Sequence, residues 1–236
     1  MKVGHNIKAE NANWSFGGEV PDTFVDHIRQ SVPLYEEGHG LVTQFSDYFV
    51  SDTSTVYELG VSTGELLRKL AVQHMGRPGA KFIGLDVEEA MVGKARAHCA
   101  DVPSIEILHE DARVLPLEKS DLIVSYYTMQ FVPPRDRQML FDKIYAALNW
   151  GGAFMMFEKV RAPDARFQDM VTTLYNDFKL SQGFSTEEIV MKTRSLKGIM
   201  EPFSTEANRD MLKRAGFVDQ MTIQKYLCFE GFLAIK

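Results

Sequence analysis

Residues 58–64 have the most informative spacing in the chain, Glu-Leu-Gly-Val-Ser-Thr-Gly, between an apolar run and a helical pattern. Gly60 allows a sharp turn and lets a ligand approach the backbone where another residue would place a Cβ atom. Gly64 allows close packing as the helix begins, and Glu58 precedes the turn, where its carboxylate can meet the amino group of a methionine moiety. The G-x-x-x-G spacing is not the G-x-G-x-x-G of dinucleotide enzymes, and no P-loop lysine is present. An ordinary strand-to-helix turn is the alternative.

Two further acids follow apolar runs later in the chain. Asp86 ends the run FIGLD, where an acid can accept hydrogen bonds from both hydroxyls of a ribose. Asp111 lies in IEILHEDA, where it can accept a hydrogen bond from an adenine amino group while the Ala112 N–H faces a ring nitrogen. Each acid alone could equally be a helix N-cap or a solvated loop residue. The three features in this order, each at the carboxyl end of a strand, predict that the chain binds S-adenosylmethionine (SAM) or a close relative of it.

A parallel sheet would bring these acids to one edge, and the chain alternates short apolar runs with helical patterns, as such a sheet requires. The predicted strands are 55–59, 81–85, 105–108, 122–125 and 153–157, and the predicted helices are 64–74, 88–99 and 135–148. The chain then closes with a helix over 205–215, which Gly216 ends, and two strand-like runs over 217–226 and 227–235. This pattern predicts an α/β, Rossmann-like class I methyltransferase fold, with a seven-stranded mixed sheet that is mostly parallel and ends in an antiparallel hairpin.

Two segments outside the predicted sheet are expected to cover its ligand edge. Residues 1–50 predict a polar tail, poorly ordered unless its aromatic residues dock on the body, followed by a short helical cap. Residues 163–200 predict a helical lid whose two helices are split at Gly183. We expect residues 1–236 to form a single SAM-binding domain.

Composition and charge exclude several classes of protein. The chain is 45% hydrophobic and 25% charged, with a net charge of −6, as in an ordinary globular protein. Acids and bases are mixed and no long basic stripe occurs, so direct nucleic-acid binding is not expected. Cys99 and Cys228 form no CxxC pair, which argues against a metal site and fits a reducing compartment. No leader and no apolar run of about eighteen residues is seen, so we expect a cytoplasmic protein without a membrane partner.

The chain resembles the carboxy-S-adenosylmethionine synthase family over almost its whole length, from SVPLYEEGH at 31–39 to GFLAIK at the end. The likeness is densest in YTMQFVPPRDRQMLFDKIYAALNWGGAFMMFEKV at 127–160 and in DFKLSQGFSTEEIVMKTRSL at 177–196. Members of this family convert SAM and prephenate to carboxy-SAM and phenylpyruvate, and serve a wobble-uridine tRNA modification pathway. The resemblance therefore implies a small-molecule substrate and a homodimer.

The resemblance also implies that Tyr35, in the helical cap, lines the cofactor pocket beside the turn and the two acids. The complete set of candidate cofactor-binding residues is Tyr35, Glu58, Gly60, Ser62, Gly64, Asp86, Val87, Asp111, Ala112 and Tyr126.

Two positions depart from the family pattern. The family has a lysine–arginine pair in the helix after the DFK segment, and the arginine holds the extra carboxylate. Here Lys192 matches the lysine, Thr193 stands where the arginine should be, and Arg194 follows one residue later. One residue on a helix is a rotation of about 100°, so Arg194 does not automatically face the same pocket.

The second departure is Tyr126, which stands in place of an asparagine. Because a buried carboxylate without a guanidinium partner is costly, the likeness covers the cofactor pocket but not the carboxylate site.

Methyl transfer from a sulfonium depends on proximity and alignment, so the lack of a catalytic dyad does not argue against catalysis. Tyr126 and Tyr127 lie where the predicted fourth strand ends and could orient a substrate or contact the sulfonium; aromatic core packing is the alternative. His39 is a candidate base, or otherwise a surface residue. Arg194 and Lys192 are candidates for binding an acidic substrate, or otherwise part of a solvated helix face.

These residues predict a SAM-dependent methyltransferase that acts on a small acceptor, and an acceptor with a carboxylate is one candidate. The first alternative is carboxy-SAM synthase itself, which the breadth of the resemblance favours. The second is a non-catalytic SAM-binding subunit, which the intact Gly60, Asp86 and Asp111 disfavour.

Overall fold

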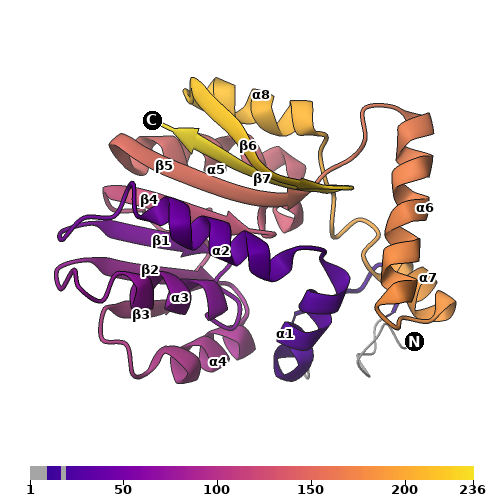
Figure 1. Cartoon of the computed structure of the whole chain (residues 1–236), viewed down its shortest axis with the longest axis horizontal. Coiled ribbons are helices and arrows are strands. Elements are labelled where there is room, and N and C mark those ends of the chain that lie inside the picture. Colours follow the sequence, from indigo (N-terminus) through magenta and orange to yellow (C-terminus); the bar gives the residue numbers. More distant parts are fainter. Residues whose placement is uncertain (1–9, 17–19) are drawn as a thin grey trace.

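The computed structural model describes residues 10–16 and 20–236, and a seven-stranded sheet forms its centre (Figure 1). The strands lie in the order β3-β2-β1-β4-β5-β7-β6. Their bounds are β1 Thr55–Leu59, β2 Lys81–Asp86, β3 Ile105–His109, β4 Ser120–Tyr126, β5 Leu148–Lys159, β6 Asp219–Tyr226 and β7 Phe229–Ile235. Strand β7 is antiparallel to both β5 and β6, and the other neighbouring strands are parallel. The predicted class I methyltransferase fold is therefore confirmed.

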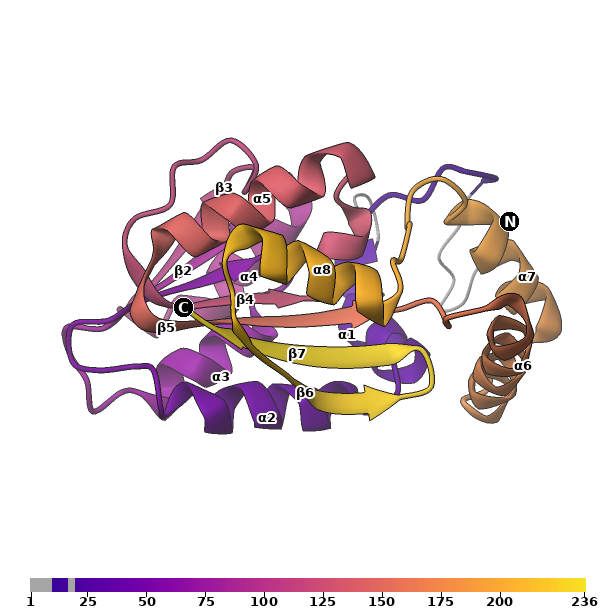
Figure 2. The same ribbon diagram turned by 90° about the horizontal axis from the view of Figure 1, so that it is seen from above.

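Helices cover both faces of the sheet (Figure 2). One face carries α5 (Pro134–Ala147) and α8 (Thr205–Ala215), and the other carries α2 (Tyr35–Ser46), α3 (Glu65–Gln73) and α4 (Glu89–Cys99). Each face has its own core of fully buried apolar side chains, centred on Phe141 and Leu212 on the first face and on Leu67 and Ala95 on the second. Burial on both faces explains why the central strands are continuous apolar runs.

Three helices stand beyond the carboxyl ends of the parallel strands, namely α1 (Val20–Ser31), α6 (Ala165–Ser181) and α7 (Thr186–Ser195) (Figure 1). The described part of the N-terminal tail docks on α7: the N–H of Ala12 donates to the carbonyl of Arg194 at 3.0 Å, and that of Trp14 to the carbonyl of Ser195 at 3.2 Å. Trp14 is buried. The prediction for the rest of the tail falls on residues 1–9 and 17–19, which lie outside the described residues.

Strand β5 starts earlier than the sequence pattern predicts. It begins at Leu148, directly after α5, and pairs there with Ser120 before a shift in register. Gly151 and Gly152 fall between the predicted helix 135–148 and the predicted strand 153–157, but both lie inside the strand. A Cβ atom at Gly152 would come within 3.0 Å of two carbonyl oxygens, so the glycine permits the irregular pairing. No helix in the described ranges is long and apolar enough to cross a membrane.

Candidate active site

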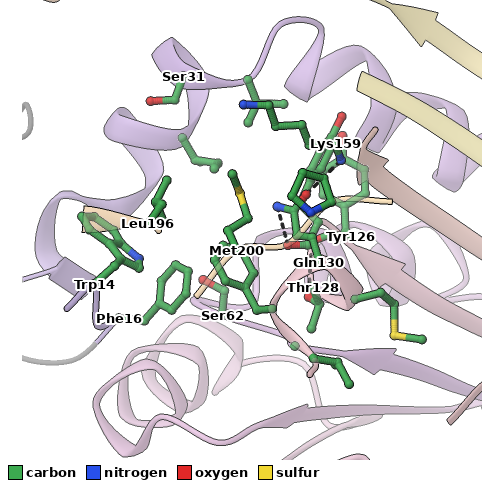
Figure 3. Close-up of a pocket in the computed structure, with 18 of the residues that line it drawn as sticks. Trp14, Phe16, Ser31, Ser62, Tyr126, Thr128, Gln130, Lys159, Leu196 and Met200 are labelled. Carbon is green, nitrogen blue, oxygen red and sulfur yellow. Dashed lines mark hydrogen bonds between the residues drawn. The ribbon is translucent and has the colours of Figure 1, made fainter. Parts of the chain in front are cut away.

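A cavity of about 940 Å³ lies between the carboxyl ends of the strands and helices α1, α6 and α7 (Figure 3). Residues that follow β1, β2, β3, β4 and β5 all border it. Ligands of open α/β sheets bind at this edge. The volume is at the upper end of the usual range for ligand sites, so a nucleoside-sized cofactor and a second small molecule can share it.

The turn after β1 forms one wall of this cavity. Gly60 has a φ of +78°, and a Cβ atom there would collide with the side chain of Thr128. Ser62 has a φ of +51°, which is uncommon for a residue with a side chain. Gly64 does not border the cavity; it packs against Cys99 where α3 begins. Gly60 therefore keeps the backbone open to a ligand, and Gly64 serves helix packing.

Glu58 is buried beside this turn and borders the cavity. Burial raises the pKa of its carboxyl group well above the usual value, the nearby Asp86 adds to the rise, and a hydrogen bond from the Leu67 N–H opposes it. Its Oε2 atom has no hydrogen-bond partner among the described residues. A ligand ammonium group would supply the missing partner, so Glu58 fits the amino end of SAM.

Asp86 ends β2 and holds the turn in place. Its Oδ2 accepts a hydrogen bond from the Ser62 N–H at 2.9 Å, and its Oδ1 accepts one from the Glu88 N–H at 3.0 Å. Burial raises the pKa of this carboxyl group. A carboxylate oxygen can accept two hydrogen bonds, so each oxygen keeps capacity for one ribose hydroxyl. Val87 follows it, exposed at the rim of the cavity.

Asp111 and Ala112 border the cavity after β3, but Asp111 already has a partner. The guanidinium of Arg113 donates to its Oδ2 at 2.6 and 2.9 Å, and lowers the pKa of the carboxyl group. Arg113 also bonds Asp136 at 3.0 Å. Arg113 was not among the predicted site residues, although its place two residues after an acid in a turn is a usable signal. The acid is thus fixed in position at the adenine end of the predicted pocket.

Three tyrosines meet where β4 ends. The hydroxyl of Tyr126 donates to the carbonyl of Tyr35 at 2.6 Å, which ties the helical cap to the sheet. Tyr127 has a φ of +58°, and its buried hydroxyl has no hydrogen-bond partner among the described residues. Burial raises the pKa of both phenols. All three tyrosines border the cavity, so each can contact a ligand bound there.

His39 lies behind these tyrosines and does not border the cavity. Its ring centroid is 4.5 Å from that of Tyr35 and 4.6 Å from that of Tyr126. Burial lowers the pKa of His39 to about 3, and the ammonium of Lys69, 3.1 Å from Nδ1, adds to this effect. The predicted role of His39 as a base therefore has no geometric support.

Helix α7 presents different side chains from those that the family pattern implies. Thr193 is exposed and donates its hydroxyl to the carbonyl of Ile189 at 2.9 Å. Arg194 reaches the rim of the cavity, with an exposed side chain. The ammonium of Lys192 instead lies over the ring of Trp14. Thus α7 directs an ammonium group inward and leaves its guanidinium group in solvent.

Two lysines that were not predicted also border the cavity, Lys159 at the end of β5 and Lys179 in α6. Gln130 fixes the backbone here, because its Oε1 accepts the Lys159 N–H at 2.9 Å and its Nε2 donates to the carbonyl of Tyr127 at 3.3 Å (Figure 3). The available signal was weak: Lys159 interrupts the end of an apolar strand, and Lys179 lies in the DFK segment.

The similarity to known proteins extends over almost the whole chain. Residues 56–152 match the methyltransferase domain family. Carboxy-S-adenosyl-L-methionine synthase of Staphylococcus epidermidis is 33% identical over 94% of this chain and 97% of its own length. The synthases of Histophilus somni strain 2336 (35%) and Klebsiella pneumoniae strain 342 (32%) align over 95% and 97% of this chain, and over 94% and 93% of their own lengths.

Solved structures share the fold at lower identity. The apo form of the S-adenosylmethionine-dependent methyltransferase SibL superposes with a TM-score of 0.61 at 14% identity, over 85% of this chain and 55% of SibL. The carbon methyltransferase CurJ gives a TM-score of 0.64 at 12% identity, over 92% of this chain and 59% of CurJ. Given these whole-length matches, the chain belongs to the carboxy-S-adenosyl-L-methionine synthase family and is a SAM-dependent transferase with a class I methyltransferase fold.

Proposed function

We propose that this enzyme transfers the methyl group of SAM to a small acceptor that bears a carboxylate. The cofactor would lie along the turn after β1, with its amino group at Glu58, its ribose at Asp86 and its adenine near Asp111 and Ala112. Helices α1, α6 and α7 would close over the second substrate. Together with the sheet they form a single SAM-binding domain in this proposal.

Methyl transfer is favoured over carboxy-SAM synthesis by the side chains of α7, because its only guanidinium group, that of Arg194, is exposed. In the family pattern an arginine on this helix holds the carboxylate of the carboxylated cofactor. Here the corresponding Thr193 bonds its own helix, and Arg194 is exposed at the rim. A hydroxyl group cannot replace the two parallel N–H bonds of a guanidinium, so ordinary SAM fits this wall better.

The residues that border the cavity supply binding and alignment, which is most of what methyl transfer requires. SAM supplies an activated methyl group on a good leaving group. Tyr126 is occupied by its bond to the Tyr35 carbonyl, so it holds the wall in shape. Tyr127, with an unpaired hydroxyl and a left-handed backbone, is the candidate to orient the acceptor. Left-handed backbone at a residue with a Cβ is a cost that functional sites often carry.

A second candidate function is carboxy-SAM synthesis, and whole-length similarity to three such synthases favours it. That reaction moves a carboxyl group from prephenate onto the methyl carbon of SAM, with loss of a proton from that carbon and of hydroxide from prephenate. The carboxylate formed would need a cation, and Arg194 or Lys192 would have to provide it.

Incubation with SAM and prephenate, followed by mass spectrometry of the small molecules, tests the proposal. We expect neither phenylpyruvate nor a cofactor heavier by one carboxyl group, and S-adenosylhomocysteine only when a methyl acceptor is present. Formation of phenylpyruvate together with carboxy-SAM would overturn methyl transfer in favour of the second candidate.

The family resemblance also supports a homodimer, and the mixed charge of the chain argues against a nucleic-acid partner. Light scattering coupled to gel filtration should give a mass near twice 26.8 kDa. Gel-shift titration with tRNA at about 150 mM salt should show no complex at micromolar protein, because a mixed-charge surface gives little counterion release.

A further inference from the structure

Residues 10–16, called the strap below, form a compact turn at the edge of the cavity. Glu10 and Asn13 pair with each other as a short antiparallel bridge, which closes the turn. After the turn, Trp14 and Phe16 both border the cavity (Figure 3). The strap therefore has a defined shape and supplies two aromatic side chains to the cavity wall.

The strap also holds helix α7 through its backbone. The N–H of Ala12 donates to the carbonyl of Arg194 at 3.0 Å, and the N–H of Trp14 donates to the carbonyl of Ser195 at 3.2 Å. Both carbonyls lie in the last turn of α7, where a helix lacks N–H donors of its own. Among the described residues, every other backbone-to-backbone hydrogen bond of α7 is made within the helix or with the residues directly next to it. The strap is therefore the backbone connection between α7 and a distant part of the chain.

Phe16 connects the strap to the body of the molecule. Its ring meets that of Phe131 edge-on, with the ring centroids 4.9 Å apart, and Phe131 ends the short helix that follows β4. Trp14 packs in the same buried cluster as Met91 of α4. Met91 lies against the turn after β1, since the hydroxyl of Ser62 donates to its sulfur at 3.6 Å. The strap thus spans the distance from α7 to the residues beside the proposed cofactor turn.

Three features of the seated strap carry a cost in free energy. Ala12 has a φ of +50°, in the left-handed region that a residue with a Cβ atom adopts only at a cost. The indole N–H of Trp14 is buried without a hydrogen-bond partner among the described residues. The ammonium group of Lys192 lies against the same indole ring, and burial lowers its pKa well below the usual value. A segment that is held by two backbone hydrogen bonds and ring contacts against such costs can leave its seat while the sheet stays folded.

We propose that the strap is a gate: its release from α7 and Phe131 opens the cavity to the cofactor, and its return closes the cavity over the bound cofactor. This inference goes beyond the proposed reaction and rests on the proposed place of the cofactor along the turn after β1. Because Trp14 and Phe16 border the same cavity, a bound cofactor adds contacts to the seated strap and favours the closed state. The opening of the strap then limits the exchange of the cofactor.

The rates of S-adenosylhomocysteine association and dissociation test the gate. Rapid mixing with tritiated ligand gives the first rate, and a chase with excess unlabelled ligand gives the second. Phe16→Ala removes the ring that holds the strap to Phe131. We expect both rates to rise about tenfold, because the loss of one aromatic contact shifts the opening equilibrium by about that factor. The dissociation constant should change by less than about threefold, since free and bound protein lose the same contact.

Phe167→Ala is the matched control, because Phe167 is an exposed aromatic residue of α6 that does not border the cavity. This variant should keep the wild-type rates, and circular dichroism shows whether each variant is folded. Faster dissociation of Phe16→Ala with unchanged association would make Phe16 a ligand contact and overturn the gate. Wild-type rates in Phe16→Ala, or equal acceleration in both variants, would overturn it as well.

A second measurement follows the strap without disturbing its seat. The chain has two tryptophans, and Trp150 is 87% exposed, so Trp150→Phe leaves Trp14 as the single fluorescent reporter. We expect saturating S-adenosylhomocysteine to protect Trp14 from quenching by acrylamide and to shift its emission to shorter wavelength. Equal quenching with and without the ligand would overturn the gate.

These experiments separate the gate from the proposed cofactor site. Absence of S-adenosylhomocysteine binding by the wild-type protein would overturn both. Tight binding with unaltered rates in Phe16→Ala would reject the gate and keep the cofactor site. Neither measurement depends on whether the enzyme transfers a methyl or a carboxyl group.

Discussion

The two walls of the cavity satisfy their charged groups in different ways. On the wall that carries Glu58, Asp86 and Asp111, called the cofactor wall after its proposed ligand, Asp86 accepts two backbone N–H bonds and Asp111 is paired with Arg113. On the wall formed by α6 and α7, called the helical wall, Lys179 and Lys192 have aromatic neighbours and no ion pair among the described residues. The cofactor wall is preorganised by its own backbone, whereas the helical wall holds buried amino groups that no carboxylate of the described residues pairs with. Preorganised groups lose little on binding, so we expect the cofactor to bind first and the acceptor second.

The largest expected effect concerns the cofactor wall. Asp86→Ala should weaken S-adenosylhomocysteine binding by about a hundredfold or more, because two hydroxyl hydrogen bonds to a charged group are worth roughly 1.5–3 kcal/mol each. Calorimetric titration measures this, with circular dichroism to show that the variant is folded. Asp86→Asn keeps one acceptor oxygen and should lie between wild type and alanine. An unchanged affinity in the alanine variant would remove Asp86 from the pocket.

The next effect concerns Glu158, a buried acid of β5 that does not border the cavity. Burial raises the pKa of Glu158 to about 8, partly opposed by Arg137. Between pH 4.5 and 8 the folded state keeps a proton that the unfolded state has lost, so the free energy of unfolding should fall as pH rises through this window. Glu158→Gln should remove this fall, on the order of 2–4 kcal/mol.

Urea denaturation at pH 5 and pH 8 gives the four unfolding free energies that this comparison needs. Glu118→Gln, at an exposed site, should keep the pH dependence of the wild type. Parallel pH curves for Glu158→Gln and wild type would mean that Glu158 is ionised in the fold.

A smaller loss is expected at the turn after β1. Gly60→Ala forces a Cβ atom into Thr128 at a φ of +78°, and the left-handed backbone alone costs about 1–3 kcal/mol. Thermal unfolding should show the loss, and SAM binding should weaken with it. Gly93→Ala, within α4 and with open space around the site, should instead gain up to about 1 kcal/mol. Equal stability of the two variants would contradict the assignment of Gly60 as the residue that keeps the backbone open.

The sequence was sufficient to predict that the residues of the proposed cofactor wall lie together, because each is placed by the end of a strand. Glu58, Gly60, Asp86 and Asp111 each lie at or just after a predicted strand, and a parallel sheet brings such positions to one edge whatever the loops do. Alternating apolar runs likewise predicted the sheet and its closing hairpin. The start of β5 was missed because two adjacent glycines are typical of a break between elements. Here pairing with β4 makes the segment that contains Gly151 and Gly152 part of a strand.

The helical wall was not predictable in the same way. Lys192 was a candidate from the sequence, but Lys159 and Lys179 lie on separate elements that packing around Tyr175 brings together, and no spacing in the sequence encodes that. His39 shows the opposite error. Its residue type suggested a base, but the rings of α2 and β4 enclose it away from the cavity. Burial determines both the pKa of such a side chain and its access to a ligand, and the sequence pattern does not reveal burial. Residue type alone is therefore a poor guide to a catalytic role.

The smallest expected effect is the most specific test of which cofactor the helical wall accepts. Thr193 is exposed on α7 and borders the cavity, so Thr193→Arg should change stability by no more than about 0.5 kcal/mol. It restores the guanidinium of the family pattern, and we expect affinity for carboxy-SAM relative to SAM to rise about tenfold, as one charge-assisted bidentate pair allows. Competitive calorimetry with both cofactors measures the ratio of the two affinities.

Arg194→Ala is the matched control: if Arg194 stays in solvent, its removal leaves the affinity ratio unchanged. Loss of carboxy-SAM preference in Arg194→Ala, with no gain in Thr193→Arg, would show that Arg194 already binds the carboxylate. The helical wall would then serve the synthase reaction rather than methyl transfer.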